Sequence, residues 1–155
     1  EKLGEHKGAH FYTIGQRHLS MANRKGQIAN SQPVYVAEKD VKTNTLVIAE
    51  GYYNPALYRK EIELAGVNFI NPITNYQLPI TVYARVRYRQ PLAPAKLTNL
   101  KLKTYKLEFD QPVKFVAAGQ SAVFYSKRQV TSDKKQGTRD KRQGEYEMLG
   151  GGIII

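Results

Sequence analysis

The alternation of side chains in residues 80–90 is the feature that most constrains how this chain can fold. Read as a strand, the segment puts Ile80, Val82, Ala84, Val86 and Tyr88 on one face and Thr81, Tyr83, Arg85, Arg87 and Arg89 on the other. The first face predicts a core stripe. Alternate residues of a strand lie about 6.6 Å apart, so the arginine face suits the successive phosphates of a nucleic acid, because each guanidinium can pair phosphate oxygens through two donors. A sheet face kept soluble by charge, or a protected edge strand, explains the same pattern.

Short alternating runs recur along the chain, and helical periodicity is scarce, so the chain is predicted to be mainly β. A turn or single helical turn is expected at Asn54–Tyr58. A hairpin is expected from residues 33–38 and 45–50, joined by a polar segment. The remaining predicted strands are residues 10–14, 61–70, 80–89, 95–109 (a lysine-rich hairpin), 121–125, 145–149 and 153–155.

Two domains are expected, with a boundary near Leu64–Gly66. Residues 1–64 form a small β module punctuated by glycine, and residues 65–155 supply enough strands for a barrel of five or six. A single continuous sandwich is the alternative. Residues 126–147 hold a basic insertion with Val130 as its one aliphatic side chain before the next strand, and it cannot bury enough apolar surface to offset the cost of ordering. We expect a mobile, disordered loop there, with an RNA-binding arm as the sharper interpretation.

Composition narrows the function. The chain has no cysteine, which removes disulfides, thiolate catalysis and cysteine-ligated zinc. Its net charge is +11, and residues 80–114 contain eight lysines and arginines against two acidic residues. Clustered positive charge with tyrosine nearby indicates a nucleic-acid partner, with an acidic lipid surface or a protein partner as alternatives. The lack of a basic amphipathic helix counts against a membrane surface, so we expect no membrane partner. No apolar run is long enough to span a membrane. The sequence begins in the middle of a motif, so we expect a piece of a longer protein.

Side chains suited to catalysis or metal binding are not grouped. His6 and His10 have the spacing of a helical metal pair, but Gly4 and Gly8 disfavour a helix and no third ligand is evident. The sequence has no paired carboxylates, no nucleophile elbow and no phosphate-binding glycine loop. We therefore predict no catalytic residue and no metal site.

Two further stretches have the residue types of a binding site. In Gly8–Arg17, Gly15 permits a turn from which Gln16 and Arg17 project. In Ala118–Tyr125, Gly119 permits a tight turn before Gln120, whose amide can both donate and accept a hydrogen bond to a sugar or a base. In both stretches the alternative is structural: the polar residues belong to a turn and bind no partner.

Six motifs stand in a recognisable order. They are His10-Phe-Tyr-Thr-Ile-Gly-Gln-Arg17, Val36-Ala-Glu-Lys-Asp40, Asn54-Pro-Ala-Leu-Tyr58, Arg87-Tyr-Arg-Gln90, Gly119-Gln-Ser-Ala-Val-Phe-Tyr125 and Leu149-Gly-Gly-Gly-Ile-Ile154. In this order the chain resembles the central and C-terminal part of the tRNA-specific 2-thiouridylases, an enzyme family also described as methyltransferases. The resemblance implies a C-terminal six-stranded β-barrel similar to the second domain of elongation factors. It also implies a cytoplasmic enzyme that uses ATP and a persulfide to place sulfur on the wobble uridine of tRNA.

The same resemblance assigns the chemistry to an upstream ATP-pyrophosphatase domain with two cysteines, served by a sulfur-relay protein. This chain would then be inactive alone, with no cofactor of its own, and would bind the anticodon region of tRNA. The tRNA contacts implied by the family motifs are Arg87, Tyr88 and Gln120. Arg85 and Arg89, from the alternation, and Gln16 and Arg17 are weaker candidates. If Tyr88 contacts RNA, it must lie at the strand end, where a core-side residue can emerge.

Two departures from the family pattern stand out. The basic insertion replaces a short turn, with Met148 at a usual cysteine position, and His18–Arg24 differ from the family's usual glycine-rich segment.

A stand-alone basic β-barrel adaptor, binding a protein partner or ribosomal RNA, is the rival hypothesis.

Overall fold

The computed structural model describes residues 2–17, 19, 32–71, 78–127 and 146–155. Contacts divide the chain into two compact units, one of residues 1–59 with 112–117 and the other of residues 60–111 with 118–155. The division falls within a strand, a few residues before the expected boundary at Leu64–Gly66.

The first unit contains a hairpin and two short 3-10 helices. Strands β1 (Val34–Asp40) and β2 (Thr45–Glu50) pair antiparallel, with Val34 opposite Glu50 and Asp40 opposite Thr45. The predicted hairpin is confirmed. Its turn is closed by the Asp40 carboxylate, which accepts hydrogen bonds from the Lys42 and Thr43 amides and the Thr43 hydroxyl. The hydroxyl and then the two amides lower the pKa of Asp40, because they stabilise the charged carboxylate.

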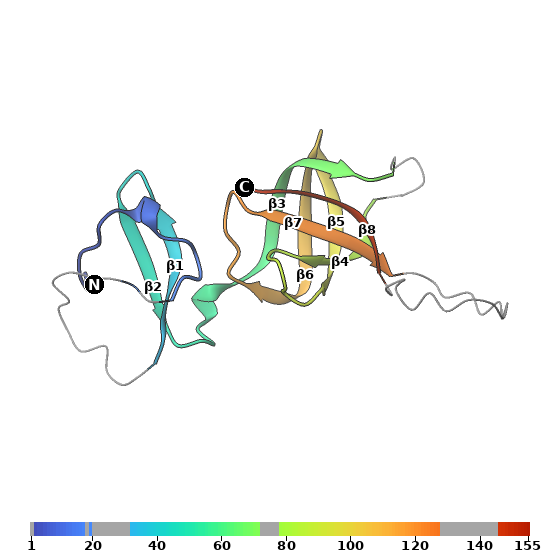
Figure 1. Ribbon diagram of the computed structural model, residues 1–155. Coiled ribbons are helices and arrows are strands. Elements are labelled where there is room, and N and C mark those ends of the chain that lie inside the picture. The colour runs from blue at the N-terminus through green and yellow to red at the C-terminus, as the bar shows by residue number, and fades with distance from the viewer. Residues whose placement is uncertain (1, 18, 20–31, 72–77, 128–145) are drawn as a thin grey trace, which may run out of the picture. The chain divides into compact units, whose positions relative to one another are not determined.

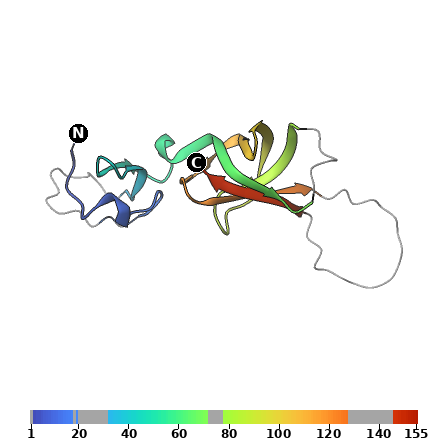
Figure 2. The same ribbon diagram turned by 90° about the horizontal axis from the view of Figure 1, so that it is seen from above.

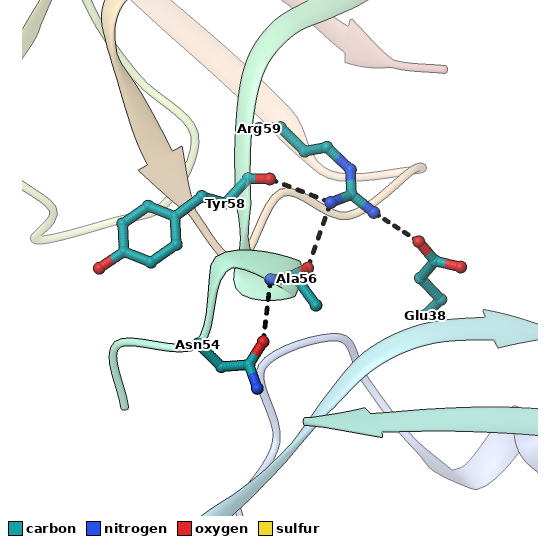
Figure 3. Close-up of polar contacts among 5 residues, drawn as sticks. All are labelled: Glu38, Asn54, Ala56, Tyr58 and Arg59. Carbon is teal, nitrogen blue, oxygen red and sulfur yellow. Dashed lines mark hydrogen bonds and ion pairs between the residues drawn. The ribbon is translucent and has the colours of Figure 1, made fainter. Parts of the chain in front are cut away.

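The predicted helical turn after the hairpin is confirmed as η2 (Pro55–Leu57). The Asn54 side chain accepts the Ala56 amide at 3.0 Å, which is a usual way to satisfy the first turn of a helix (Figure 3). Arg59 follows the turn. Its guanidinium donates to the Ala56 and Tyr58 carbonyls and pairs with Glu38 at 2.7 Å, so it links the turn to β1.

The strand predicted at His10–Ile14 is wrong. Residues 9–11 form a 3-10 helix, η1 (Ala9–Phe11), and a turn follows at residues 14 and 15. Gly8 precedes η1 with φ 138°, and the Ala9 amide donates to the Asn44 side chain at 2.8 Å. The hydrogen bond to the distant Asn44 and the positive φ of Gly8 impose this turn, although the local alternation of residues favours a strand.

The core of this unit is small and aromatic. Tyr35, Ala37, Ala49 and Leu57 are buried together, and Tyr58 and Phe115 pack against them. The Phe115 amide donates to the Leu57 carbonyl at 2.9 Å, which attaches residues 112–117 to the unit.

The second unit is a closed barrel of six strands, which confirms the predicted fold class (Figures 1 and 2). Its strand order is β3-β6-β5-β4-β7-β8. The strands are β3 (Tyr58–Phe69), β4 (Ile80–Arg85), β5 (Ala93–Lys101), β6 (Thr104–Lys114), β7 (Ser121–Lys127) and β8 (Tyr146–Ile154).

Alternating apolar residues fill the barrel. Val82 and Ala84 of β4 are fully buried, as the core stripe predicts. The largest side chains inside the barrel are also fully buried: Phe109, Phe124, Leu64, Leu97 and Leu107. Each residue of this kind contributes about 1.5–3 kcal/mol by leaving water.

Strand β8 closes the barrel between β3 and β7. Two of its three glycines are needed because the neighbouring backbones approach closely: a Cβ on Gly150 would collide with the Asn68 carbonyl oxygen, and one on Gly151 would lie 2.8 Å from the Ala122 oxygen. The ends of the expected insertion are strand residues, Ser126 and Lys127 in β7 and Tyr146 and Glu147 in β8. Its remaining residues, 128–145, lie outside the described part of the chain.

Candidate nucleic-acid interface

The arginine segment leaves the barrel wall earlier than its alternation predicts. Strand β4 ends at Arg85, and the Gln90 amide donates to the Arg87 carbonyl at 3.2 Å to close a turn in which Arg89 has φ 64°. The expected row of three arginines at strand spacing is therefore wrong. A strand continues only where a neighbour pairs with it, and β5 begins at Ala93, which lies opposite Ala84, so β4 has no partner in β5 beyond that residue.

The end of β4 releases Tyr88 from the core stripe. Val86 is still buried, but the Tyr88 side chain is 83% exposed. The Arg89 guanidinium lies over the Tyr88 ring, 5.5 Å from its centroid. Tyr88 thus lies beyond the strand end, as it must to contact RNA, with a cation beside it and a ring available for stacking.

Arg87 lies in the bend between the strand and this turn and is partly buried. Burial lowers the pKa of Arg87, because loss of hydration disfavours the charged guanidinium. An arginine pKa is ordinarily above about 12, so the group stays protonated at neutral pH. A cation that has already lost part of its hydration has less water to give up when it pairs with a phosphate.

The environment of Arg85 differs from that of Arg87 and Arg89. Its guanidinium donates to the Tyr125 hydroxyl at 3.0 Å and lies 5.6 Å from the centroid of that ring. Both side chains are half-buried on the outer face of β4 and β7. Arg85 therefore fastens two strands together.

Gln120 is held at the start of β7 by its backbone. Gly119, with φ 83°, supplies the predicted tight turn and donates to the Ile154 carbonyl at 2.8 Å, and the Ile154 amide donates back to the Gln120 carbonyl at 2.8 Å. The Gln120 side-chain oxygen is shielded from solvent and has no hydrogen-bond partner among the residues that the structure describes. An orphaned acceptor of this kind is costly to the fold and more typical of a functional position.

The barrel register brings these residues to one end. Strands β4 and β7 run antiparallel with Ala84 opposite Phe124 and Arg85 opposite Val123. The residues that follow β4, including Arg87 and Tyr88, therefore lie at the same end of the barrel as Gly119 and Gln120, which precede β7. We call this set of Arg87, Tyr88, Arg89 and Gln120 the barrel-end cluster.

Gln16 and Arg17 belong to the first unit. The Gln16 side-chain oxygen accepts the Thr13 amide at 3.0 Å, and its backbone carbonyl accepts the Val36 amide at 3.1 Å. Gln16 thus closes its own turn and fixes it to β1. Arg17 follows and is exposed.

The two histidines considered as metal ligands have separate contacts. His6 accepts the Gly8 amide and packs edge-on against Tyr12, whereas His10 packs against Phe11. Within the described ranges, no three His, Cys, Asp or Glu side chains are grouped so that they could hold a metal ion. In the same ranges, no helix has the length and apolarity needed to cross a membrane.

One cluster in the first unit was missed by sequence reasoning. The Lys114 ammonium lies 3.0 Å from the centroid of the Tyr52 ring, with Tyr53 and Tyr58 within 5.0 Å. The adjacent tyrosines after Gly51 were a visible signal. The lysine was not, because it follows Tyr52 by 62 residues.

Comparison with known proteins gives matches to both parts of the chain. Residues 1–50 match the family described as tRNA methyl transferase PRC-barrel domain, and residues 59–131 match the aminomethyltransferase beta-barrel domain. The words methyl transferase and aminomethyltransferase are part of the two family descriptions and do not state the activity of this chain.

Three curated relatives of this chain carry the same name. The tRNA-specific 2-thiouridylase MnmA of Coxiella burnetii is 34% identical over 153 residues, which is 98% of this chain and 36% of the relative. The enzymes of the same name from Lactobacillus gasseri and Chlamydia trachomatis are 35% and 38% identical over 80% and 79% of the chain. The chain spans about a third of the length of these relatives. The chain belongs to the tRNA-specific 2-thiouridylase family.

Proposed function

We propose that this chain is the tRNA-binding portion of an enzyme that places sulfur on position 2 of the wobble uridine (U34) of tRNA. The observation that carries the proposal is the grouping of Arg87, Tyr88 and Gln120 at one barrel end, in a member of the 2-thiouridylase family. The net charge of +11 supports a polyanionic partner.

Each member of the barrel-end cluster has a distinct role in this proposal. Arg87, a partly dehydrated cation, pairs a phosphate and so positions the RNA. Tyr88 stacks on a base or bonds to a sugar, as aromatic side chains do with unpaired nucleotides. Gln120 fixes the position by hydrogen bonding. Arg89 adds charge beside the stacked ring, and Arg85 acts indirectly through the strand that it fastens.

The sulfur chemistry is assigned elsewhere in the parent enzyme. A persulfide needs a cysteine, and this chain has none. The described residues do not fit ATP either, because the two described helices, η1 and η2, are 3-10 segments of three residues and neither follows a phosphate-binding glycine loop. In this proposal, as the family resemblance implies, ATP, the reactive cysteines and the contact with a sulfur-relay protein belong to the ATP-pyrophosphatase domain of a cytoplasmic parent enzyme. In the same proposal, residues 1–64 are part of the central domain and residues 65–155 are the C-terminal domain.

A binding measurement tests the proposal. Fluorescence anisotropy of a labelled, unmodified tRNA transcript with a wobble uridine should rise as the chain is added. The logarithm of the affinity should fall linearly with the logarithm of the salt concentration between about 50 and 200 mM, because the lysines and arginines that pair with phosphates release condensed counterions. Unlabelled tRNA should compete better than a ribosomal RNA fragment of equal length.

Two results would defeat the proposal. Absence of tRNA binding at low salt would favour the adaptor hypothesis with a protein partner, and equal competition by the ribosomal fragment would favour an adaptor for ribosomal RNA. As a check on where the chemistry lies, the chain incubated with tRNA, ATP and a persulfide donor should form no 2-thiouridine.

A further inference from the structure

Two tyrosines of the described chain are exposed far more than the others, and both have the same local arrangement. Tyr88 of the barrel unit is 83% exposed, with the Arg89 guanidinium 5.5 Å from its ring centroid. Tyr53 of the first unit is 81% exposed, with the Lys114 ammonium 4.7 Å from its ring centroid. Each ring has a cation over it and most of its surface in solvent.

A tight turn presents Tyr53. The Asn54 amide donates to the Gly51 carbonyl at 3.3 Å, which puts Tyr52 and Tyr53 at the two central positions of the turn. The base of the turn is fixed twice: the Gly51 amide donates to the Pro33 carbonyl at 2.9 Å, and the Asn54 side chain donates to the Glu50 carbonyl at 3.1 Å. Tyr53 is therefore exposed on a backbone that is already ordered.

Tyr52 and Lys114 hold the Tyr53 ring from one side. Lys114 donates to the Tyr52 carbonyl at 2.8 Å, and its ammonium lies 3.0 Å from the Tyr52 ring centroid. Tyr52 contacts Tyr53 edge-on, with ring centroids 5.2 Å apart and planes at 88°. Tyr52 also packs against Tyr35, which is buried, so it is attached to the core of the unit. Tyr53 has no such burial, and the fold does not need its ring.

We infer that Tyr53 is a second stacking site for an unpaired RNA base, with Lys114 supplying positive charge for the adjoining phosphate. The inference rests on the proposed function, because it takes the RNA bound by the barrel-end cluster as the ligand, but it assigns a separate surface. An ordered, exposed aromatic ring beside a cation is the arrangement with which proteins bind single-stranded nucleotides. The net charge of +11 favours RNA over an apolar peptide as the occupant.

The absence of tryptophan in this chain allows a direct test. Tyr53→Trp introduces a single tryptophan at the site, and Val41→Trp introduces one in the β1–β2 turn of the same unit, where Val41 is 59% exposed. In the Tyr53→Trp protein, titration with the unmodified tRNA transcript should quench the tryptophan fluorescence and shield it from acrylamide, because a stacked base covers the ring. The Val41→Trp protein should show neither effect.

Affinity supplies the second readout. Tyr53→Ala should weaken tRNA binding about tenfold, because the variant loses the stacking of one base, while Tyr53→Phe should bind like the original chain. The salt slope should stay unchanged in both, because no cation is lost. If the chain binds tRNA but Tyr53→Ala binds equally and Tyr53→Trp is not quenched, the stacking site is wrong while the proposed function stands. If the unchanged chain binds no tRNA, the proposed function fails and this inference with it.

Discussion

The Arg85 guanidinium donates a 3.0 Å hydrogen bond to the Tyr125 hydroxyl and lies over the Tyr125 ring, so one pair of side chains joins β4 to β7 on the outer face of the barrel. Strand β4 ends, and strand β7 begins, beside the barrel-end cluster. Arg85 therefore acts on the cluster through the geometry of the strands, whereas Arg87 and Arg89 lie in the cluster itself.

Tyr125→Phe tests this link, because it removes the hydroxyl and keeps the ring. We expect the free energy of unfolding in urea to fall by about 1 kcal/mol, the usual net value of a hydrogen bond in a protein. The tRNA affinity should change less than it does in Arg87→Ala. A Tyr125→Phe protein with unchanged stability would show that the hydrogen bond does not join the strands.

Gln120→Met tests whether the orphaned side-chain oxygen of Gln120 is kept for binding. Replacing a side chain whose shielded oxygen has no hydrogen-bond partner among the described residues by an apolar side chain of similar size should raise the free energy of unfolding by about 1 kcal/mol, while tRNA binding should weaken. Urea denaturation and anisotropy on the same samples measure both effects. A variant that loses stability would mean that Gln120 has a structural partner and that its amide is needed by the fold.

Gly150→Ala should be severely destabilising, because its Cβ would collide with the Asn68 carbonyl oxygen where β8 meets β3. We expect a loss of about 3 kcal/mol, at the upper end for overpacking. Gly66→Ala is the matched control: a Cβ there meets nothing within 4 Å, although φ is 58°. The control should lose only about 1 kcal/mol, from the left-handed backbone. Equal losses in the two variants would contradict this account of barrel closure.

Asp40 makes the stability of the first unit sensitive to acid. Its pKa is lowered in the folded chain, so its carboxylate stabilises the fold fully above the unfolded pKa of about 3.9, and this contribution is lost as pH falls through the lower folded pKa. In urea denaturation, Asp40→Ala should be less stable than the original chain at neutral pH, and the difference should shrink on acidification below about pH 3.9. A difference that is constant with pH would show that the carboxylate charge is not involved.

Much of the fold follows from local pattern. Alternation at Val82 and Ala84 predicts β4, because a strand inside a barrel wall has one face in the core. Alternation also misleads, as at His10–Ile14, where Gly8 and a hydrogen bond to Asn44 impose a 3-10 turn. The end of β4 at Arg85 depends on where its neighbour β5 begins, at Ala93 opposite Ala84, which the residues of β4 do not encode.

Some residues of the candidate site could likewise be predicted from the sequence, and others could not. Arg87, Tyr88 and Gln120 could be named as candidates because they stand in short motifs that resemble those of the 2-thiouridylase family. The Lys114–Tyr53 contact could not, because it joins residues far apart in the chain through a fold that only the core assembles.

The most direct test of the account is the salt dependence of tRNA binding by Arg87→Ala, compared with Lys101→Ala. Both variants lose one positive charge, but Lys101 lies at the far end of β5, roughly 26 Å along the strand from Ala93, which pairs beside Arg85. Arg87→Ala should weaken binding about tenfold at low salt and reduce the slope of log affinity against log salt by about one. Lys101→Ala should leave both nearly unchanged. Equal effects of the two variants, or no effect of Arg87→Ala on either quantity, would contradict the claim that this end of the barrel binds tRNA.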